Sequence, residues 1–175
     1  MNPPFKVVNR HTRDPNRTVR RVYCGRPSIW GNPFSIGEGR FTRQESIWKY
    51  FWHLVATPHK LRRINDLRGC DLECFCAPRE CHCDVLIQLA NDAHLHFQFV
   101  RLLSNPGVTE ETFNHNRDSL SAEQVDLVHG IMAKVFPSAM QRMIAACPPA
   151  TTVSSEILTT MRANGDMGTP EPAED

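Results

Sequence analysis

The sequence of 175 residues lacks any long run of apolar residues. A membrane-spanning helix needs about 18 or more uncharged apolar residues in succession, and the chain contains no such run. Its first residues, Met1-Asn-Pro-Pro-Phe-Lys6, do not form the apolar stretch of a signal peptide. These absences predict a soluble, cytoplasmic protein that has no membrane partner.

Three common motifs of nucleotide and metal chemistry are also missing. The chain has no Gly-Lys-Ser/Thr phosphate loop, no Gly-x-Gly-x-x-Gly pattern and no His-Glu-x-x-His pair. Their absence argues against a standard NTPase, dehydrogenase or zinc protease. With a hydrophobic content of 41%, the chain can bury one core, which fits a single domain with appendages.

Cysteine is abundant and unevenly placed. Five of the seven cysteines fall between Cys70 and Cys83, while Cys24 and Cys147 stand alone. An odd count in a reducing compartment disfavours a disulfide framework, and such crowding is typical of metal binding or thiol chemistry. We interpret the two isolated cysteines as small buried apolar residues.

The net charge of +1 hides an asymmetry between the two ends of the chain. Residues 1–69 hold 14 Lys and Arg against 4 Asp and Glu, whereas residues 70–175 hold 6 against 15. Arg17, Arg20 and Arg21 lie in a basic segment whose charge density suits nucleic acid. Alternatively, the basic segment pairs with the acidic half, and the sequence leaves both interpretations open.

The pattern of apolar residues predicts an α/β fold. Short strands are expected at 5–9, at 19–24 and at the end of 67–76, and Thr42-Arg-Gln-Glu45 has the capping-box form that begins a helix reaching about Ala56. The order strand, helix, strand favours a parallel pair with a right-handed crossover. The sequence therefore predicts a small single domain with a short, partly parallel sheet flanked by helices.

Further helices are expected in the rest of the chain. One should begin at Cys81 and continue as far as Leu103, and the capping box at Ser121 opens another that ends before Pro137. A short helix is expected over 138–146. We divide the chain into an α/β domain (1–104), a helical extension that offers a surface for a protein partner (105–147), and a linker with a disordered tail (148–175).

The second motif segment gathers thiols and an imidazole. Cys74 and Cys76 project from one side of the expected strand, and the chain returns at Cys81 and His82. Three thiols and an imidazole are a ligand set that zinc accepts, although Cys-x-Cys is tighter than usual zinc spacing and adjacent Cys81 and His82 do not easily face one ion. The alternatives are a reactive Cys81 thiolate assisted by His82 at a helix N-terminus, or thiols that only pack the junction.

The first motif segment, Gly25-Arg-Pro-Ser-Ile-Trp-Gly-Asn-Pro-Phe34, is an irregular loop. Arg26 suits a phosphate, Ser28 and Asn32 are neutral donors, and Trp30 offers a stacking face for a base. Alternatively, Trp30 pins the loop to the core and Asn32 satisfies backbone groups. Because ligands bind beyond the carboxyl ends of parallel strands, the two motif segments should meet at one sheet edge.

Both segments resemble a family catalogued as domain of unknown function 4326, which is found mainly in bacteria and their phages. The resemblance rests on the loop from Gly25 to Phe34 and on Leu72-Glu-Cys-Phe-Cys-Ala-Pro-Arg-Glu-Cys-His82, and it spans about residues 5–92. It implies that Arg26, Ser28, Trp30, Asn32 and the Cys74, Cys76, Cys81 and His82 cluster belong to one family site. Cys83 departs from the pattern, because a small residue is expected after the Cys-His pair, and either Cys83 or Cys70 could substitute for one of the metal ligands.

The motifs support two functional hypotheses. The first is a protein that acts on or binds a nucleotide or nucleic acid, and one version of it is an enzyme that acts on a nucleotide or modified base. In this hypothesis Arg26 and Trp30 bind the ligand, and the cysteines and His82 supply metal or thiol chemistry. The second is a noncatalytic, zinc-stabilised module that binds nucleic acid or protein. The sequence identifies neither a reaction nor a substrate.

Overall fold

The computed structural model describes residues 5–38 and 40–136. Every described helix and strand belongs to one compact unit. The helix expected over 138–146, Cys147 and the expected tail lie outside the described residues.

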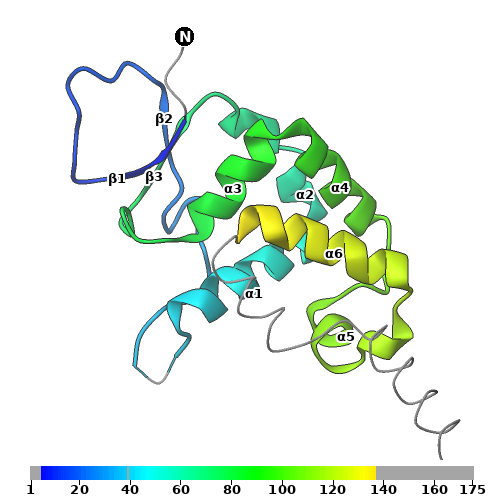
Figure 1. Cartoon of the computed structure of the whole chain (residues 1–175). Coiled ribbons are helices and arrows are strands. Elements are labelled where there is room, and N and C mark those ends of the chain that lie inside the picture. Colours follow the sequence, from blue (N-terminus) through cyan, green and yellow to red (C-terminus); the bar gives the residue numbers. More distant parts are fainter. Residues whose placement is uncertain (1–4, 39, 137–175) are drawn as a thin grey trace, which may run out of the picture. The chain divides into compact units, whose positions relative to one another are not determined.

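Three short strands form the sheet. They are β1 (Val7–Asn9), β2 (Arg21–Tyr23) and β3 (Asp71–Cys74). The order is β1-β3-β2, and β3 pairs in parallel with both neighbours. The parallel arrangement confirms the predicted α/β class, and in Figure 1 the three strands gather at the left of the domain with α3 beside them. Because β3 is central, Asp71 and Leu72 are fully buried.

Helix α1 (Arg43–Ala56) begins as predicted. The Thr42 hydroxyl accepts from the Glu45 amide at 3.3 Å, and the Glu45 carboxylate accepts from the Thr42 amide at 2.7 Å. These two bonds satisfy amides that have no partner inside the helix. The helix ends before Pro58, which opens the short helix α2 (Pro58–Leu61), and a 3-10 turn over Ile64–Leu67 then leads into β3.

The single helix predicted from Cys81 to Leu103 is in fact two helices, α3 (His82–Asn91) and α4 (Ala93–Leu103). The prediction was wrong at Asp92, which has an extended backbone and whose carboxylate accepts from the Leu95 amide at 2.9 Å. A side chain that caps a new helix competes with continuation of the old one. As a result α3 packs against both β3 and α1, while α4 packs against α3 and α6.

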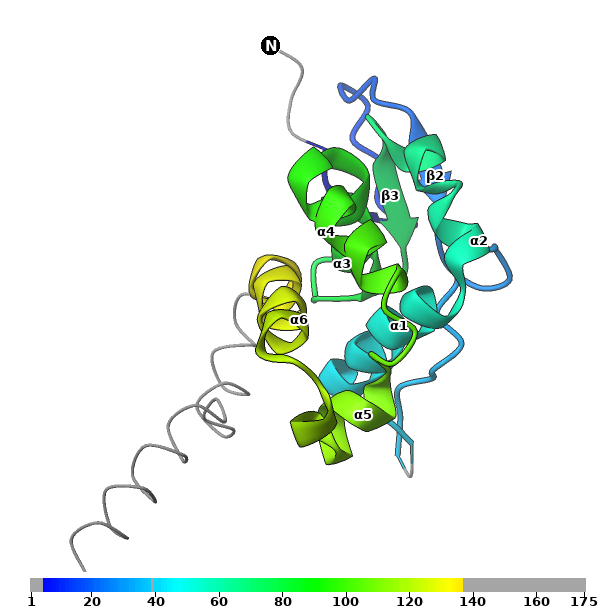
Figure 2. The same ribbon diagram turned by 90° about the vertical axis from the view of Figure 1, so that its right-hand side faces the viewer.

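The remaining helices are α5 (Glu110–His115) and α6 (Ala122–Val135), with a 3-10 turn over Arg117–Ser119 between them. The capping box at Ser121 confirms the predicted start of α6, whereas α5 was not predicted. Helix α6 packs on α4 and α3, and Figure 2 shows it beside these two helices. None of the helices within the described residues is long and apolar enough to cross a membrane.

Candidate metal centre

The two motif segments meet at the carboxyl edge of the sheet, as predicted. The loop from Gly25 follows β2, and the segment from Phe75 follows the parallel strand β3. Between them lies a pocket of about 360 Å³. Its walls include Arg26, Arg43, Cys74, Cys76, Cys81 and His82.

Four buried side chains form a cluster with the composition of a metal site. They are Cys74, Cys81, His82 and Cys83, and their ligand atoms all lie within 4.8 Å of one another. All four side chains are at most 5% exposed. The cluster shares three members with the predicted ligand set, but Cys83 takes the place of Cys76. We refer to these four residues as the Cys/His cluster.

The start of α3 explains how three consecutive residues reach one point. Cys81 is the N-cap and has an extended backbone, with φ −155° and ψ 177°, whereas His82 and Cys83 lie in the first helical turn. The change from extended to helical backbone turns their side chains inward together. The expectation that Cys81 and His82 do not easily face one ion was therefore wrong. Asp84 fixes this start, because its carboxylate accepts from the Cys81 amide at 2.6 Å.

His82 is held by a hydrogen bond to a backbone carbonyl. Its Nε2 lies 2.8 Å from the carbonyl oxygen of Cys24, at the end of β2. Because a carbonyl oxygen only accepts, Nε2 carries the hydrogen and the neutral ring keeps its lone pair on Nδ1. The ring also meets Tyr50 edge-on, with centroids 4.9 Å apart. Burial is the largest single effect and opposes a charged ring, but the hydrogen bond and charge of Cys81, the Cys24 carbonyl and the charge of Cys74 together outweigh it and raise the pKa of His82.

The cysteine thiols of the site differ in their pKa values. Hydrogen bonds from Cys74, Cys76 and Cys83 lower the pKa of Cys81 well below that of an ordinary thiol. Hydrogen bonding to Cys74 and then to Cys81 raises the pKa of Cys76, and burial adds to the rise. Burial raises the pKa of the neighbouring Asp84 to about 6. The arrangement therefore favours thiolate at Cys81, and thiolate is the form that binds metals.

Cys76 lies at the edge of the cluster. It is partly exposed, lines the pocket and hydrogen-bonds with Cys74 and Cys81, but it is outside the group of four. Cys81, predicted as a catalytic nucleophile with His82, is only 2% exposed, and His82 only 5%. A molecule in the pocket would therefore reach Cys76 more easily than Cys81.

The loop after β2 is pinned to the core. Trp30 is 4% exposed, and its carbonyl accepts from the Tyr50 hydroxyl at 2.8 Å. Asn32 donates to the Ser46 carbonyl and hydroxyl and accepts from the Phe34 amide. These contacts favour packing, rather than ligand binding, for both Trp30 and Asn32.

Arg26 and Ser28 occupy different surroundings in the same loop. Arg26 is exposed, lines the pocket and donates to the Ser35 hydroxyl at 2.6 Å. The Ser28 hydroxyl is buried and has no hydrogen-bond partner among the described residues. Of the four residues predicted to bind a ligand, Arg26 is therefore the one whose side chain is exposed at the pocket and available to a ligand.

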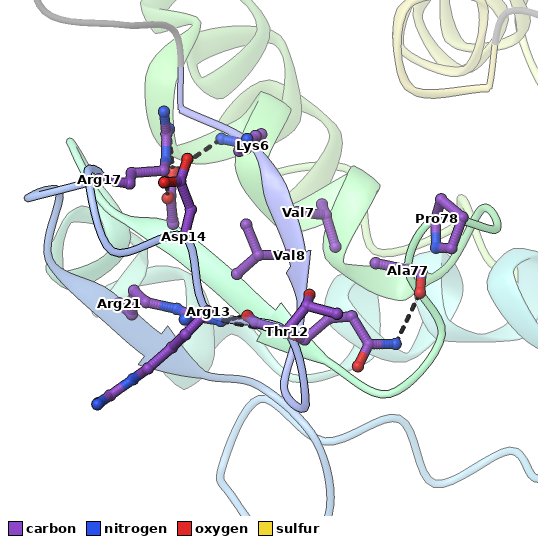
Figure 3. A pocket seen from close by; sticks show the side chains of 12 residues that line it. Lys6, Val7, Val8, Thr12, Arg13, Asp14, Arg17, Arg21, Ala77 and Pro78 are labelled. Atoms are coloured by element: carbon purple, nitrogen blue, oxygen red, sulfur yellow. Dashed lines mark hydrogen bonds and ion pairs between the residues drawn. The ribbon is translucent and has the colours of Figure 1, made fainter.

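The basic segment is partly neutralised within the domain. Arg17 forms an ion pair with buried Asp71, and Arg21 pairs with Glu73 at 2.7 Å. Both arginines line a second pocket of about 480 Å³ around β1, where Figure 3 shows Arg17 and Arg21 with Arg13 and Asp14. These pairs favour the interpretation that the basic segment balances acidic residues from the later half. Arg20 is exposed, so its predicted contact with nucleic acid stays a prediction.

Sequence reasoning missed an exposed group of side chains at this edge. Phe75 was treated only as the residue opposite the thiols, yet it is 51% exposed, and Tyr23 and His11 lie beside it. Arg10 lies over the Tyr23 ring at 4.0 Å from its centroid. A signal was present, because each of these residues lies within two positions of the end of a predicted strand.

Residues 7–92 match the model of a family described as Domain of unknown function (DUF4326). This segment belongs to that family. The match covers both motif segments and α3, which confirms the resemblance noted from the motifs. No curated protein and no solved structure matches the chain. The family description assigns no activity.

Proposed function

We propose that the domain is a zinc-binding protein whose ion joins the end of β3 to the start of α3. The observation that carries this proposal is the Cys/His cluster, in which four donor atoms lie within 4.8 Å of one another. In tetrahedral zinc sites the Zn–S bond of about 2.3 Å places sulfur atoms roughly 3.8 Å apart. The cluster is therefore compact enough for its donors to surround one ion after small side-chain adjustments.

The chemistry of the donors supports zinc. Thiolates with one imidazole form a common structural zinc set, and structural sites are closed to solvent. A histidine ligand usually donates its other ring hydrogen to a carbonyl or carboxylate, which fixes the ring. His82 has this arrangement, because its Nε2 faces the Cys24 carbonyl at 2.8 Å. The imidazole of His82 and the sulfur atoms of Cys74, Cys81 and Cys83 would then hold the ion.

Metal analysis of the purified protein tests this proposal. We expect one equivalent of zinc, and chelation should lower the midpoint of thermal unfolding because the ion stabilises the folded state alone. Cys83→Ser should lose the zinc, whereas Cys76→Ser should retain it. Cys70→Ser is the matched control, because Cys70 is 2% exposed but lies outside the cluster. Zinc-free protein that also fails to take up added zinc, or loss of zinc from Cys76→Ser but not Cys83→Ser, would overturn the ligand set.

A second candidate is a nucleotide- or nucleic-acid-directed protein, with or without catalysis. This candidate is favoured by the composition of the pocket, because Arg26, Arg43 and Cys76 all line it. Guanidinium groups recognise phosphate, and Cys76 is the thiol that a bound molecule could approach. If this function is correct, a bound nucleotide should slow alkylation of Cys76, and Arg26→Ala should abolish that protection. Alkylation at the same rate with and without nucleotide would contradict it.

A further inference from the structure

The carboxyl ends of all three strands carry a group of side chains that we define as the aromatic platform: exposed Arg10, His11 and Phe75 with half-buried Tyr23. Arg10 and His11 follow β1, Tyr23 ends β2, and Phe75 follows β3. The Phe75 ring lies 5.2 Å from that of His11 and 6.1 Å from that of Tyr23, centroid to centroid. Parallel pairing thus brings together side chains that are up to 65 positions apart in sequence (Arg10 to Phe75).

The platform is held in place before any ligand arrives. The Tyr23 hydroxyl donates to the Arg26 carbonyl at 2.8 Å, and the Arg10 guanidinium lies over the ring. Gly25 lies against the same ring so closely that a Cβ atom there would be 2.5 Å from the Tyr23 hydroxyl oxygen. A rigid aromatic surface loses little conformational entropy on binding. The absence of a side chain at Gly25 is therefore what allows the ring to lie in this position.

Positive charge surrounds the platform. Arg10 belongs to it, and Arg26 and Arg43 line the adjoining pocket, of which Phe75 also forms a wall. None of these three guanidinium groups forms an ion pair with a carboxylate of the described residues. This distinguishes them from Arg17 and Arg21, which are neutralised by Asp71 and Glu73.

We propose that the aromatic platform and the adjoining pocket bind single-stranded nucleic acid. An unpaired base would stack on the exposed face of Phe75, and Arg10, Arg26 and Arg43 would contact the flanking phosphates. Exposed aromatic rings interleaved with unpaired cations are the combination that binds single strands, because every base has a face for stacking. A duplex keeps its bases stacked on each other and cannot use Phe75. The proposal goes beyond metal binding and gives a ligand class to the second candidate function, on whose phosphate-binding pocket it rests.

Fluorescence anisotropy with a labelled single-stranded DNA of about 12 nucleotides tests this proposal. Phe75→Ala should weaken binding about fivefold to hundredfold, the value of one stacked base. Phe97→Ala is the matched control, because Phe97 is 61% exposed on α4 and outside the platform, and the affinity of this variant should not change. Arg10→Gln should weaken binding and reduce the slope of log Kd against log salt by about 0.7, whereas the exposed Arg62→Gln should do neither.

Four results would overturn the proposal. They are no binding of the single strand at low salt, equal affinity for a duplex of the same length, equal effects of Phe75→Ala and Phe97→Ala, and full affinity for a mononucleotide. Zinc measured in the same samples separates the proposals, because neither the platform nor the two pocket arginines, Arg26 and Arg43, belong to the Cys/His cluster. If zinc-free protein binds the single-stranded DNA, only the metal proposal fails. If a mononucleotide protects Cys76 but the single-stranded DNA does not bind, only the proposal of single-strand binding fails.

Discussion

The ring Nε2 of His82 lies 2.8 Å from the carbonyl oxygen of Cys24, so the first turn of α3 is tied directly to the end of β2. The bond crosses 58 positions of sequence and is buried. It places the imidazole beside the three thiols of the Cys/His cluster and fixes which nitrogen carries the hydrogen. The same contact therefore serves the fold and the proposed metal site.

Replacing His82 by phenylalanine should separate these two roles. His82→Phe keeps an aromatic ring next to Tyr50 but leaves the Cys24 carbonyl buried without its donor, which costs about 1–3 kcal/mol of unfolding free energy. It also removes one proposed ligand, so chelator should no longer lower the midpoint of thermal unfolding. His129→Phe is the control, because His129 contacts Phe113 away from the cluster and its chelator response should remain. An undiminished chelator response in His82→Phe would exclude His82 as a ligand.

Trp30 and Phe75 should show opposite behaviour on truncation. Trp30→Ala removes a side chain that is 4% exposed, and such a change typically costs about 3–5 kcal/mol of unfolding free energy. Phe75→Ala removes a ring that is 51% exposed and should leave stability nearly unchanged. Urea unfolding of both variants measures the difference. Equal losses of stability would mean that Phe75 is part of the core and unavailable as a stacking surface.

This contrast shows what the sequence can and cannot reveal about the site. The convergence of the two motif segments was predictable, because strand order and parallel pairing determine which loops share an edge. The burial of Trp30 was not, because aromatic residues in a loop serve packing and binding equally well, and only the Tyr50 and Asn32 contacts decide between them. For the same reason Phe75, one residue beyond β3, looked like a spacer between thiols.

The sequence also left the fourth member of the cluster open, because Cys76, Cys83 and Cys70 could each supply it. Alternation along an extended strand placed Cys76 beside Cys74, but β3 ends at Cys74 and the alternation ends with it. Cys83 joins the cluster because the backbone changes from extended to helical at Cys81, a bend of the chain that no residue spacing encodes. Helix starts at Thr42 and Ser121 were predictable, because their capping boxes depend on local residues alone.

Asp71 should make stability depend on acid pH. Burial opposes ionisation, but hydrogen bonds from Arg17 and from the Lys6 amide outweigh it and lower the pKa of Asp71. A lowered pKa in the folded state contributes stability that is fully present above the unfolded value of about 3.9 and is lost as the pH falls through the folded value. Asp71→Asn should therefore cost about 1.5–3 kcal/mol near pH 7, the usual worth of a hydrogen bond to a charged group.

The cost of Asp71→Asn should begin to shrink below about pH 4, where the carboxylate of the unfolded wild type becomes protonated, and should shrink further as the pH falls through the lowered folded-state pKa. Urea unfolding at pH 7 and at successively lower pH measures this convergence. Asp66→Asn is the control, because the Arg63 and Asp66 pair is exposed, with side chains 60% and 51% accessible, and should contribute little at any pH. A difference between wild type and Asp71→Asn that stays constant into strong acid would contradict ionisation of Asp71 as its cause.

Gly25 and Tyr23 should show strong coupling in a double-mutant cycle. In Gly25→Ala the new methyl group would lie 2.5–2.8 Å from the Tyr23 ring and hydroxyl, so the ring must move and break its bond to the Arg26 carbonyl. Overpacking of this kind typically costs about 1–3 kcal/mol. In a Tyr23→Ala background the methyl group meets no ring, so Gly25→Ala should cost almost nothing. If the two losses of stability measured by urea unfolding are additive, Gly25 is required for its backbone conformation and not for contact with Tyr23. In that case Gly25 does not position the Tyr23 ring for binding of the single strand.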